Sequence, residues 1–221
     1  LQEDLFIADI DYSASGGPKK RILRVPIHLL EENPDFDRNR MVGKEFVKSS
    51  DFKFTGPTDM EFDQENRIFL SDEDSIYVIW SHGETHQPVM TRIIYTPGRR
   101  WSGLEFDLNG TFYFADYESG DLFALRNTEL NNLLSGTMVI SSDIELLTTA
   151  WLLRKGLKNP YDIELELPFQ QTMIVSTIEG WDYFRLPVVG RLNFNPEEME
   201  IVRFATRGKV TFLPDSNNQF I

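Results

Sequence analysis

Aspartates recur at matching positions along this chain, and carboxylates arranged in this way can bind a divalent cation. Asp59 and Asp162 each begin an expected strand, whereas Asp9, Asp72 and Asp116 each end one. Carboxylates that converge on one point repel each other unless a cation compensates, and their oxygen atoms suit Ca²⁺. A bound cation can polarise a carbonyl while a carboxylate activates water. The pattern nominates Asp59, Asp116 and Asp162 as calcium ligands, and Asp162 and Asp116 as catalytic residues of a hydrolase.

The same aspartates also have a structural interpretation. An aspartate at the beginning of a strand or in a turn commonly accepts hydrogen bonds from backbone N–H groups. Asp9, Asp72 and Asp116 recur once per repeat, whereas a catalytic residue is needed only once. Recurrence therefore favours a structural role for these three residues.

The elements that carry the aspartates repeat at an offset of 44 residues. Residues 60–63 followed by 68–72 match residues 104–107 followed by 112–116. Alternating apolar and polar residues with turn residues between them predict short antiparallel strands. A repeat of ~40–45 residues built from such strands is typical of one β-propeller blade. The predicted fold class is all-β, a β-propeller of four-stranded antiparallel blades with WD40-like architecture.

A single propeller domain over residues 1–221 is expected to contain four repeat units. Their approximate ranges are 4–50, 54–98, 101–156 and 159–206, with a closing strand within 209–221. The first unit lacks a first strand in the sequence, so the C-terminal strand is expected to supply it and to close the ring. The alternative is that the chain forms part of a five- or six-bladed ring.

Strand positions follow from the same alternation of residue types. The expected strands are 4–9, 21–27, 41–47, 57–63, 67–71, 75–80, 89–95, 103–107, 111–116, 121–125, 159–165, 172–177, 190–194, 199–205 and 210–213. Residues 127–158 interrupt the third unit. Within them a helix over residues 144–155 is favoured, with Ser142 or Asp143 as its N-cap, and an apolar outer strand is the alternative. Met138–Ile140 is expected to be the fourth strand of that unit.

Three aromatic residues are candidates for ligand binding. Trp101, Tyr161 and Trp181 lie near the beginnings of units or in turns. Aromatic side chains at the mouth of a propeller can stack on sugars or peptides, and the alternative is that they pack between blades.

Composition restricts the partners. The net charge of −13 and the pI near 4.7 disfavour binding to nucleic acid and to anionic membranes. The absence of cysteine excludes disulfides, thiolate zinc sites and cysteine nucleophiles.

No apolar run is long enough to span a membrane. The sequence begins at Leu1 rather than Met, and we expect a secreted or periplasmic protein. The sequence predicts no oligomeric state.

The repeat resembles the blade motif of the NHL and SMP-30/gluconolactonase-like propeller families. The motif is Gly or Asn, Pro, any residue and Asp with alternating apolar positions, then a turn and an apolar run that ends in Ala-Asp or Ser-Asp. Residues 56–72, 103–116 and 159–177 carry the likeness, with a partial match at 4–9. The resemblance implies a propeller fold for the chain.

The SMP-30-like enzymes hold a divalent cation at the propeller axis with Glu, Asn and Asp side chains. The positions here that match the usual Asn ligand are Thr58, Ser102 and Tyr161, so the chain departs from that pattern. A weaker likeness, carried by residues 68–70 and 112–114, is to hemopexin-like four-bladed rings, whose usual cysteine pair is absent here.

Two functions remain after these observations. The first is a β-propeller module that binds a protein, peptide or glycan at one face, needs no cofactor, and is favoured by the missing Asn ligands. The alternative is a divalent-metal-dependent hydrolase of the lactonase or esterase type, with Ca²⁺ in a carboxylate-lined central site.

Overall fold

A computed structural model describes residues 4–11, 19–26, 44–48, 54–80, 88–165, 172–185 and 201–204. The contacts divide the chain into two units. The first contains Leu1–Pro57 and Ser81–Val89, and the second contains Thr58–Trp80 and Met90–Ile221. The expected strands at 190–194 and 210–213 lie outside the described residues.

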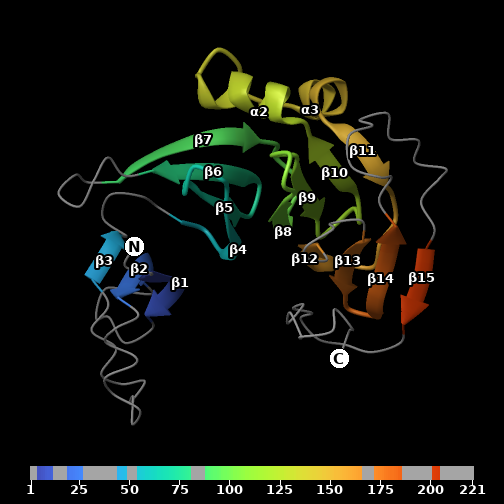
Figure 1. The fold of residues 1–221 in the computed structure, drawn as a ribbon, viewed down its shortest axis with the longest axis horizontal. Helices are drawn as coiled ribbons and strands as arrows, with labels where there is room; N and C mark the ends of the chain where they lie inside the picture. The colour runs from blue at the N-terminus through green and yellow to red at the C-terminus, as the bar shows by residue number, and fades with distance from the viewer. Residues whose placement is uncertain are drawn as a thin grey trace, which may run out of the picture. The chain divides into compact units, whose positions relative to one another are not determined.

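The first unit contains one antiparallel sheet of three strands. They are β1 (Asp4–Asp11), β2 (Lys19–Pro26) and β3 (Lys44–Val47), paired in that order (Figure 1). Asp9 lies directly opposite Arg21, whose Nε donates to its Oδ2 at 2.8 Å. Opposite charges facing each other across two strands stabilise this register. The three strands predicted for the first repeat unit are confirmed.

The second unit contains three sheets of four strands, each paired in sequence order, except that the first residues of β4 and β7, Pro57 and Val89, are counted with the first unit (Figure 1). The first sheet comprises β4 (Pro57–Phe62), β5 (Ile68–Asp72), β6 (Ser75–Trp80) and β7 (Val89–Tyr95). The second comprises β8 (Trp101–Phe106), β9 (Phe112–Asp116), β10 (Leu122–Leu125) and β11 (Trp151–Arg154). The third comprises β12 (Pro160–Leu165), β13 (Thr172–Thr177), β14 (Gly180–Arg185) and β15 (Ile201–Phe204). These sheets are the predicted antiparallel blades, and the all-β fold class is confirmed.

The hairpins between the first and second strands of the first two sheets in this unit have the same hydrogen bonds. Asp63 Oδ1 accepts hydrogen bonds from the backbone N–H groups two and four residues later, and Asp107 Oδ1 does the same one repeat further on. Each turn has one residue in the left-handed region, Asn66 with φ 59° and Gly110 with φ 77°. Asparagine and glycine are the residues that adopt this conformation at least cost. The 44-residue step therefore encodes the same turn twice.

Strand β9 shows why the second sheet is buried on both faces. Phe112 and Phe114 belong to an apolar cluster shared with the first sheet, whereas Tyr113 and Ala115 belong to a second cluster shared with the third sheet. Successive side chains of a strand point to opposite faces, so one strand contributes to both cores. The ring centroids of Phe106 and Phe112 are 4.7 Å apart. A sheet covered on both faces by neighbouring sheets is the packing expected of a propeller blade.

The segment that interrupts the third repeat unit, residues 127–158, contains two helices, α2 (Asn127–Leu134) and α3 (Asp143–Thr149). Ser142 is the N-cap of α3, as predicted, and its side chain accepts from Glu145 N. The predicted helix is too long, because residues 151–154 instead pair with β10 as strand β11. Met138–Ile140 is not the fourth strand: Ile140 forms only an isolated parallel bridge with Ile94.

The third strand of the last sheet also differs from the prediction. It is β14, which begins at Gly180 directly after a tight turn, not the segment 190–194. Thr177 Oγ1 donates to Gly180 O at 3.0 Å across this turn. Ile178 and Glu179, the two residues of this turn, are not of the types typical of a hairpin turn.

None of the helices in the described part of the chain has the length and apolar character needed to cross a membrane.

Two glycines offer a matched test of blade packing. Gly120 and Gly136 both have φ 72°, but a Cβ on Gly120 would lie 2.0 Å from Leu157 O, whereas a Cβ on Gly136 meets nothing within 4 Å. Gly136→Ala should lower the free energy of unfolding by about 1 kcal/mol, the cost of a left-handed alanine. Gly120→Ala should lower the free energy of unfolding by a further ~1–3 kcal/mol, because the connection to the third sheet must shift. Urea denaturation measures both, and equal losses would contradict this account of the packing.

Candidate functional site

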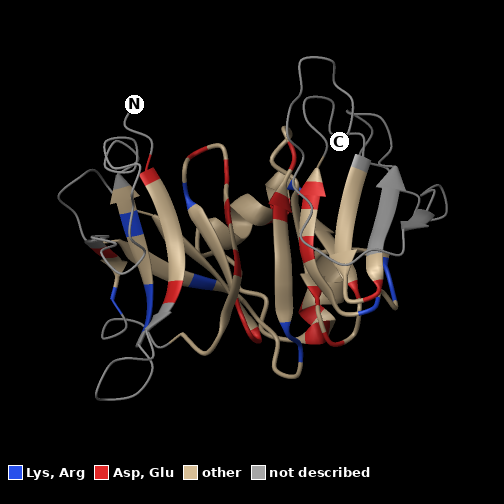
Figure 2. Cartoon of the chain, turned by 90° about the horizontal axis from the view of Figure 1, so that it is seen from below, with Lys and Arg blue, Asp and Glu red and all other residues tan. Residues whose placement is uncertain are grey.

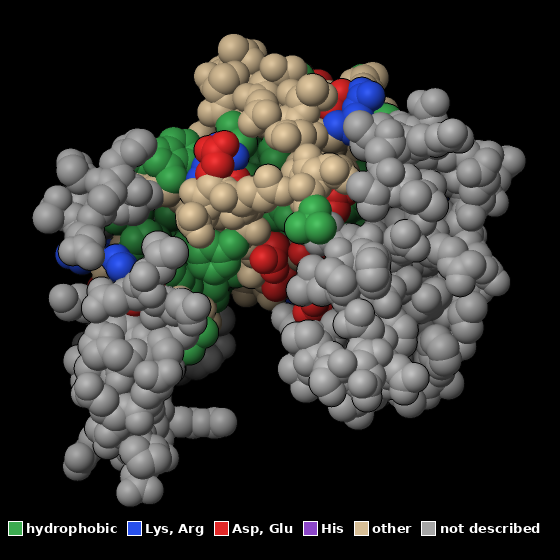
Figure 3. Space-filling model, in the orientation of Figure 1, with side chains coloured by type: hydrophobic (Ala, Val, Ile, Leu, Met, Phe, Trp, Pro, Cys, Tyr) green, Lys and Arg blue, Asp and Glu red, His purple; other side chains and the backbone are tan. Residues whose placement is uncertain are grey.

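Three glutamates occupy the same position on the first strands of the three sheets in the second unit. They are Glu61 on β4, Glu105 on β8 and Glu164 on β12, and each is half-buried. We call them the glutamate row. Acidic residues recur along the strands and loops of this unit (Figure 2), and acidic side chains reach the surface near the centre of the face in Figure 3.

The glutamates of the row have related surroundings. Phe62 N donates to Glu61 Oε1 at 2.8 Å, and Phe106 N donates to Glu105 Oε1 at 2.7 Å, so two side chains fold back onto their own strands in the same way. Glu105 also accepts a backbone hydrogen bond from Leu165 on β12. The carboxyl group of Glu105 therefore bridges the second and third sheets.

The middle glutamate of the row, Glu105, has a strongly raised pKa. Burial raises the pKa of Glu105 to about 9, and the negative charges of Glu61 and Glu164 contribute to the increase. Burial disfavours the charged form, and nearby like charges disfavour it further. At neutral pH the row therefore holds a proton on Glu105 between two neighbouring acidic groups.

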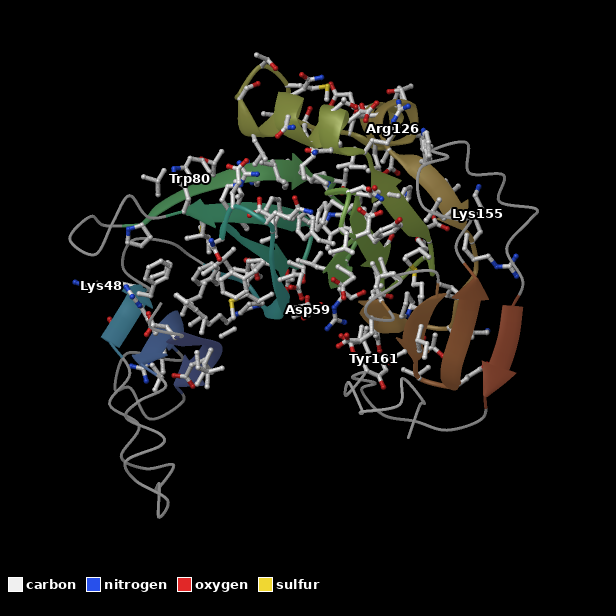
Figure 4. All side chains as sticks on the ribbon, in the orientation of Figure 1. Lys48, Asp59, Trp80, Arg126, Lys155 and Tyr161 are labelled. Atoms are coloured by element: carbon white, nitrogen blue, oxygen red, sulfur yellow. The ribbon has the colours of Figure 1, made fainter. Side chains whose placement is uncertain are left out.

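Hydroxyl groups join the first strands at the positions where the resemblance implied an Asn ligand. Thr58 Oγ1 donates to Trp101 O at 2.8 Å, linking the first sheet to the second. Ser102 Oγ makes the equivalent bond to Pro160 O at 2.6 Å, linking the second sheet to the third. These two side chains therefore hold neighbouring blades together. Tyr161, at the third matching position, lies half-buried on β12 (Figure 4).

Asp59 and Asp162 lie two residues before Glu61 and Glu164 on the same strands (Asp59 is labelled in Figure 4). Asp59 Oδ2 accepts from Leu104 N on β8 at 2.8 Å, and its Oδ1 accepts from Met60 N at 2.9 Å. Asp59 is thus a further link between first strands. Asp162 is buried on β12.

Asp116 is buried at the end of β9 and has a dense set of hydrogen-bond donors. Its Oδ2 accepts from Arg99 at 2.9 Å and from Ser119 Oγ at 2.7 Å, and its Oδ1 accepts from the backbone of Arg100 and Glu118. A cation would have to displace the Arg99 guanidinium to reach this carboxylate. The arrangement matches the structural interpretation of the recurring aspartates.

Two of the three predicted calcium ligands are engaged in other contacts. Asp59 and Asp116 already accept hydrogen bonds through both carboxylate oxygens. Within the described ranges, no group of three Asp, Glu or His residues could hold a metal ion. A role for Asp116 or Asp162 in catalysis stays a prediction.

The aromatic candidates occupy different surroundings. Trp101 is completely buried, with its ring 5.2 Å from that of Phe114 and 5.9 Å from that of Phe123. Stacking of Trp101 on a ligand would require this core to open, so its observed contacts are those of packing. Tyr161 remains accessible in part. Trp181 lies on β14, and its side chain is outside the described part of the structure.

Sequence reasoning did not single out the glutamate row, although the signal was present. Glu61 and Glu105 are separated by the same 44 residues as the aspartates, and Glu164 holds the matching place in the next unit. The electrostatic coupling of these residues depends on how closely the first strands approach each other, which no local pattern encodes.

Comparison with known proteins supports the fold and leaves the family open. No protein-family model and no curated protein matches the sequence. The structure is similar to a putative phosphatase from Bacteroides thetaiotaomicron, with 12% identity and a TM-score of 0.54 over 91% of this chain and 45% of that chain. It is also similar to virginiamycin B lyase from Staphylococcus aureus, a β-propeller solved as an inactive variant with quinupristin. That likeness has 11% identity and a TM-score of 0.50 over 93% of this chain and 60% of that chain.

At these identities the likeness shows the fold alone, which is that of a β-propeller. The chain spans about half the length of these two neighbours. The activity and ligand of either neighbour therefore cannot be transferred to it.

The pKa of Glu105 predicts a pH-dependent stability. The unfolded chain releases this proton near pH 4.5, whereas the folded protein retains it up to about pH 9. The folded state thus binds more protons in this interval, so the contribution of Glu105 to stability is complete below pH 4.5 and is lost as the pH rises towards 9. The expected slope is at most about 1.4 kcal/mol per pH unit.

Glu105→Gln should remove this slope, because an amide has no proton to lose, and should make the protein more stable than the unmodified chain at pH 8. Urea denaturation across this pH range measures the effect. Glu118→Gln, at a side chain that is 57% exposed, is the matched control and should leave the slope unchanged. A slope that persists in Glu105→Gln would show that another group is responsible.

The hydroxyl link between sheets gives a second prediction. Ser102→Ala removes the donor to Pro160 O and to Ala115 O, and leaves these carbonyls in a buried site. The free energy of unfolding should fall by about 1–3 kcal/mol. Thr148→Ala, which removes an exposed hydroxyl on α3, should change it by less than about 0.5 kcal/mol. Thermal or urea unfolding distinguishes these outcomes, and similar losses would contradict a special role for the link.

Proposed function

We propose that this chain is a β-propeller binding module that takes a cationic group of a protein or peptide partner at the glutamate row. The observation that carries the proposal is the placement of Glu61, Glu105 and Glu164 on three adjacent first strands, close enough for their charges to interact. The propeller fold supports it, because propellers offer their first strands and the adjoining loops for binding.

Charge complementarity favours a cation as the ligand. The charges of Glu61 and Glu164 disfavour the ionised form of Glu105, and an arginine or lysine side chain beside the row would favour it. Arginine suits the row particularly well, because its planar guanidinium binds carboxylates in pairs. The net charge of −13 would also speed the approach of a basic partner.

We do not propose the hydrolase alternative. The acids nominated for metal binding include Asp59 and Asp116, and the structure uses both as hydrogen-bond acceptors that hold strands and turns. The members of the glutamate row act on one another through their charges, and we assign the row to charge recognition.

A tri-arginine peptide provides the test, with isothermal titration calorimetry at pH 7 as the measurement. Glu61→Gln and Glu164→Gln should each weaken binding by about tenfold, or about 1.4 kcal/mol. Glu118→Gln removes the same charge from an exposed side chain and should change the affinity by less than about twofold. Equal effects of all three substitutions would reduce the interaction to general electrostatics and would overturn the proposal.

Binding should also release a proton. A guanidinium beside Glu105 lowers the pKa of its carboxyl group, so part of the bound proton is lost when the peptide binds at pH 7. Titrations in buffers with different ionisation enthalpies measure the release, which should disappear in Glu105→Gln. Unchanged release in that variant would place the peptide away from the row.

A further inference from the structure

The connection between β11 and β12 concentrates positive charge on an acidic chain. Three of the five residues 154–158 are basic, whereas the whole chain has a net charge of −13. They are Arg154, Lys155 and Lys158, which we call the basic loop, and all three are exposed. Figure 4 shows Lys155 beside β11, well apart from the labelled Asp59 and Tyr161 of the first strands.

The backbone of this connection is held by both of the sheets that it joins. Leu157 N donates to Gly120 O at 2.9 Å, in the turn between β9 and β10. Lys158 O accepts from Ile178 N at 3.1 Å, in the turn between β13 and β14. Leu157 is also buried in the apolar cluster shared by the second and third sheets. The basic loop therefore extends from an ordered backbone, which reduces the conformational entropy lost when a ligand binds.

The other basic side chains described in the second unit are all engaged. Ion pairs join Arg67 to Asp63, Arg99 to Asp116, Arg100 to Glu118 and Arg126 to Glu129. The guanidinium carbon of Arg92 lies 4.2 Å from the ring centroid of Tyr95. Among the described residues, no ion pair or cation–π contact includes a member of the basic loop. The uncompensated cations of this unit thus lie together in one connection.

The acidic residues nearest to the basic loop do not neutralise it. Glu118 and Asp121 lie on either side of Gly120, and they pair with Arg100 and Arg99. Glu179 follows Ile178, whose N–H contacts the loop backbone, and none of the ion pairs in the described part of the chain joins Glu179 to Lys158. An anionic group at the loop would therefore gain the attraction of three cations that no described acid compensates.

We propose that the basic loop binds a short acidic segment of a partner protein, one that carries two or three Asp or Glu side chains. Arg154 would bind one carboxylate through paired N–H groups, and Lys155 and Lys158 would attract further carboxylates as point charges. The loop favours a short segment, because five residues span at most roughly 17 Å. The net charge of −13 disfavours a long polyanion such as a nucleic acid, whose other phosphates would meet the acidic remainder of the chain.

This site does not depend on the glutamate row. Glu164 is the member of the row nearest to the loop in sequence, and it lies six residues after Lys158, towards the other end of β12. Six residues of extended chain cover about 20 Å. The two sites also select ligands of opposite charge, so a result at one leaves the other unaffected.

Fluorescence anisotropy of a labelled penta-glutamate peptide, measured with the full chain at low ionic strength, tests the proposal. A penta-glutamine peptide is the matched ligand without charge. We expect the glutamate peptide to bind and the glutamine peptide not to bind. Lys155→Gln together with Lys158→Gln should weaken binding by about tenfold, because two charge contacts are lost. Failure of the glutamate peptide to bind would overturn the proposal.

A lysine elsewhere on the chain provides the control for net charge. Lys48→Gln removes the same charge from an exposed residue of the first unit, and it should change the affinity by less than about 1.5-fold. Lys155→Gln alone should weaken binding by about threefold. Equal losses in the two single variants would attribute the binding to net charge and would overturn the proposal.

Two further results would assign the basic loop to another ligand and overturn the proposal. One is a single-stranded DNA oligonucleotide that binds more tightly than the peptide and loses its affinity in the double variant. The other is a dimer in sedimentation velocity that the double variant dissociates, because the acidic segment would then belong to a second copy. Circular dichroism of the double variant should match that of the unmodified protein, since both lysines are exposed.

Discussion

Side-chain hydrogen bonds between the first strands of neighbouring sheets are the interaction on which the second unit depends. Thr58 donates to Trp101 O, and Ser102 makes the equivalent bond to Pro160 O. At Gly103, an added Cβ would lie 2.7 Å from the backbone of Asp162, so this contact admits no side chain. The first strands can therefore approach each other closely only where the residues at the contact are small or hydrogen-bonded. At two of the positions that match the usual Asn ligand, Thr58 and Ser102 supply these links.

The close approach of first strands has an electrostatic consequence. It brings Glu61, Glu105 and Glu164 near enough that the two outer charges add to the burial that raises the pKa of Glu105. A protein that only needed to pack its sheets could place neutral residues at these positions. Retaining three acids where they repel each other costs stability at neutral pH, and such a cost is common at sites that bind ligands.

The sequence predicted the features that depend on local pattern. The alternation of residue types located β6, β7 and β13 with their observed bounds, because alternation and turn residues act over a few positions. It failed at β14, whose turn at Ile178 and Glu179 has no typical residue, and at β11, where pairing with β10 overrides an apparent helix. The donors to Asp116 and the coupling of the glutamates could not be predicted, because they arise from residues that meet only after the sheets pack.

Recurrence has a different meaning at the two kinds of repeated acid. Asp72 and Asp116 end second strands, and Asp116 is satisfied by donors within its own turn and the adjacent linker. Asp116 needs no other copy for these contacts, which favours a structural role for the repeated aspartate. The glutamates lie on first strands, which converge, so their copies interact and form one composite row. A residue repeated in every blade can thus belong to a single functional site when it lies on the first strands, which lie next to one another. The position of the residue within the blade, and not its repetition, therefore decides between a structural and a functional role.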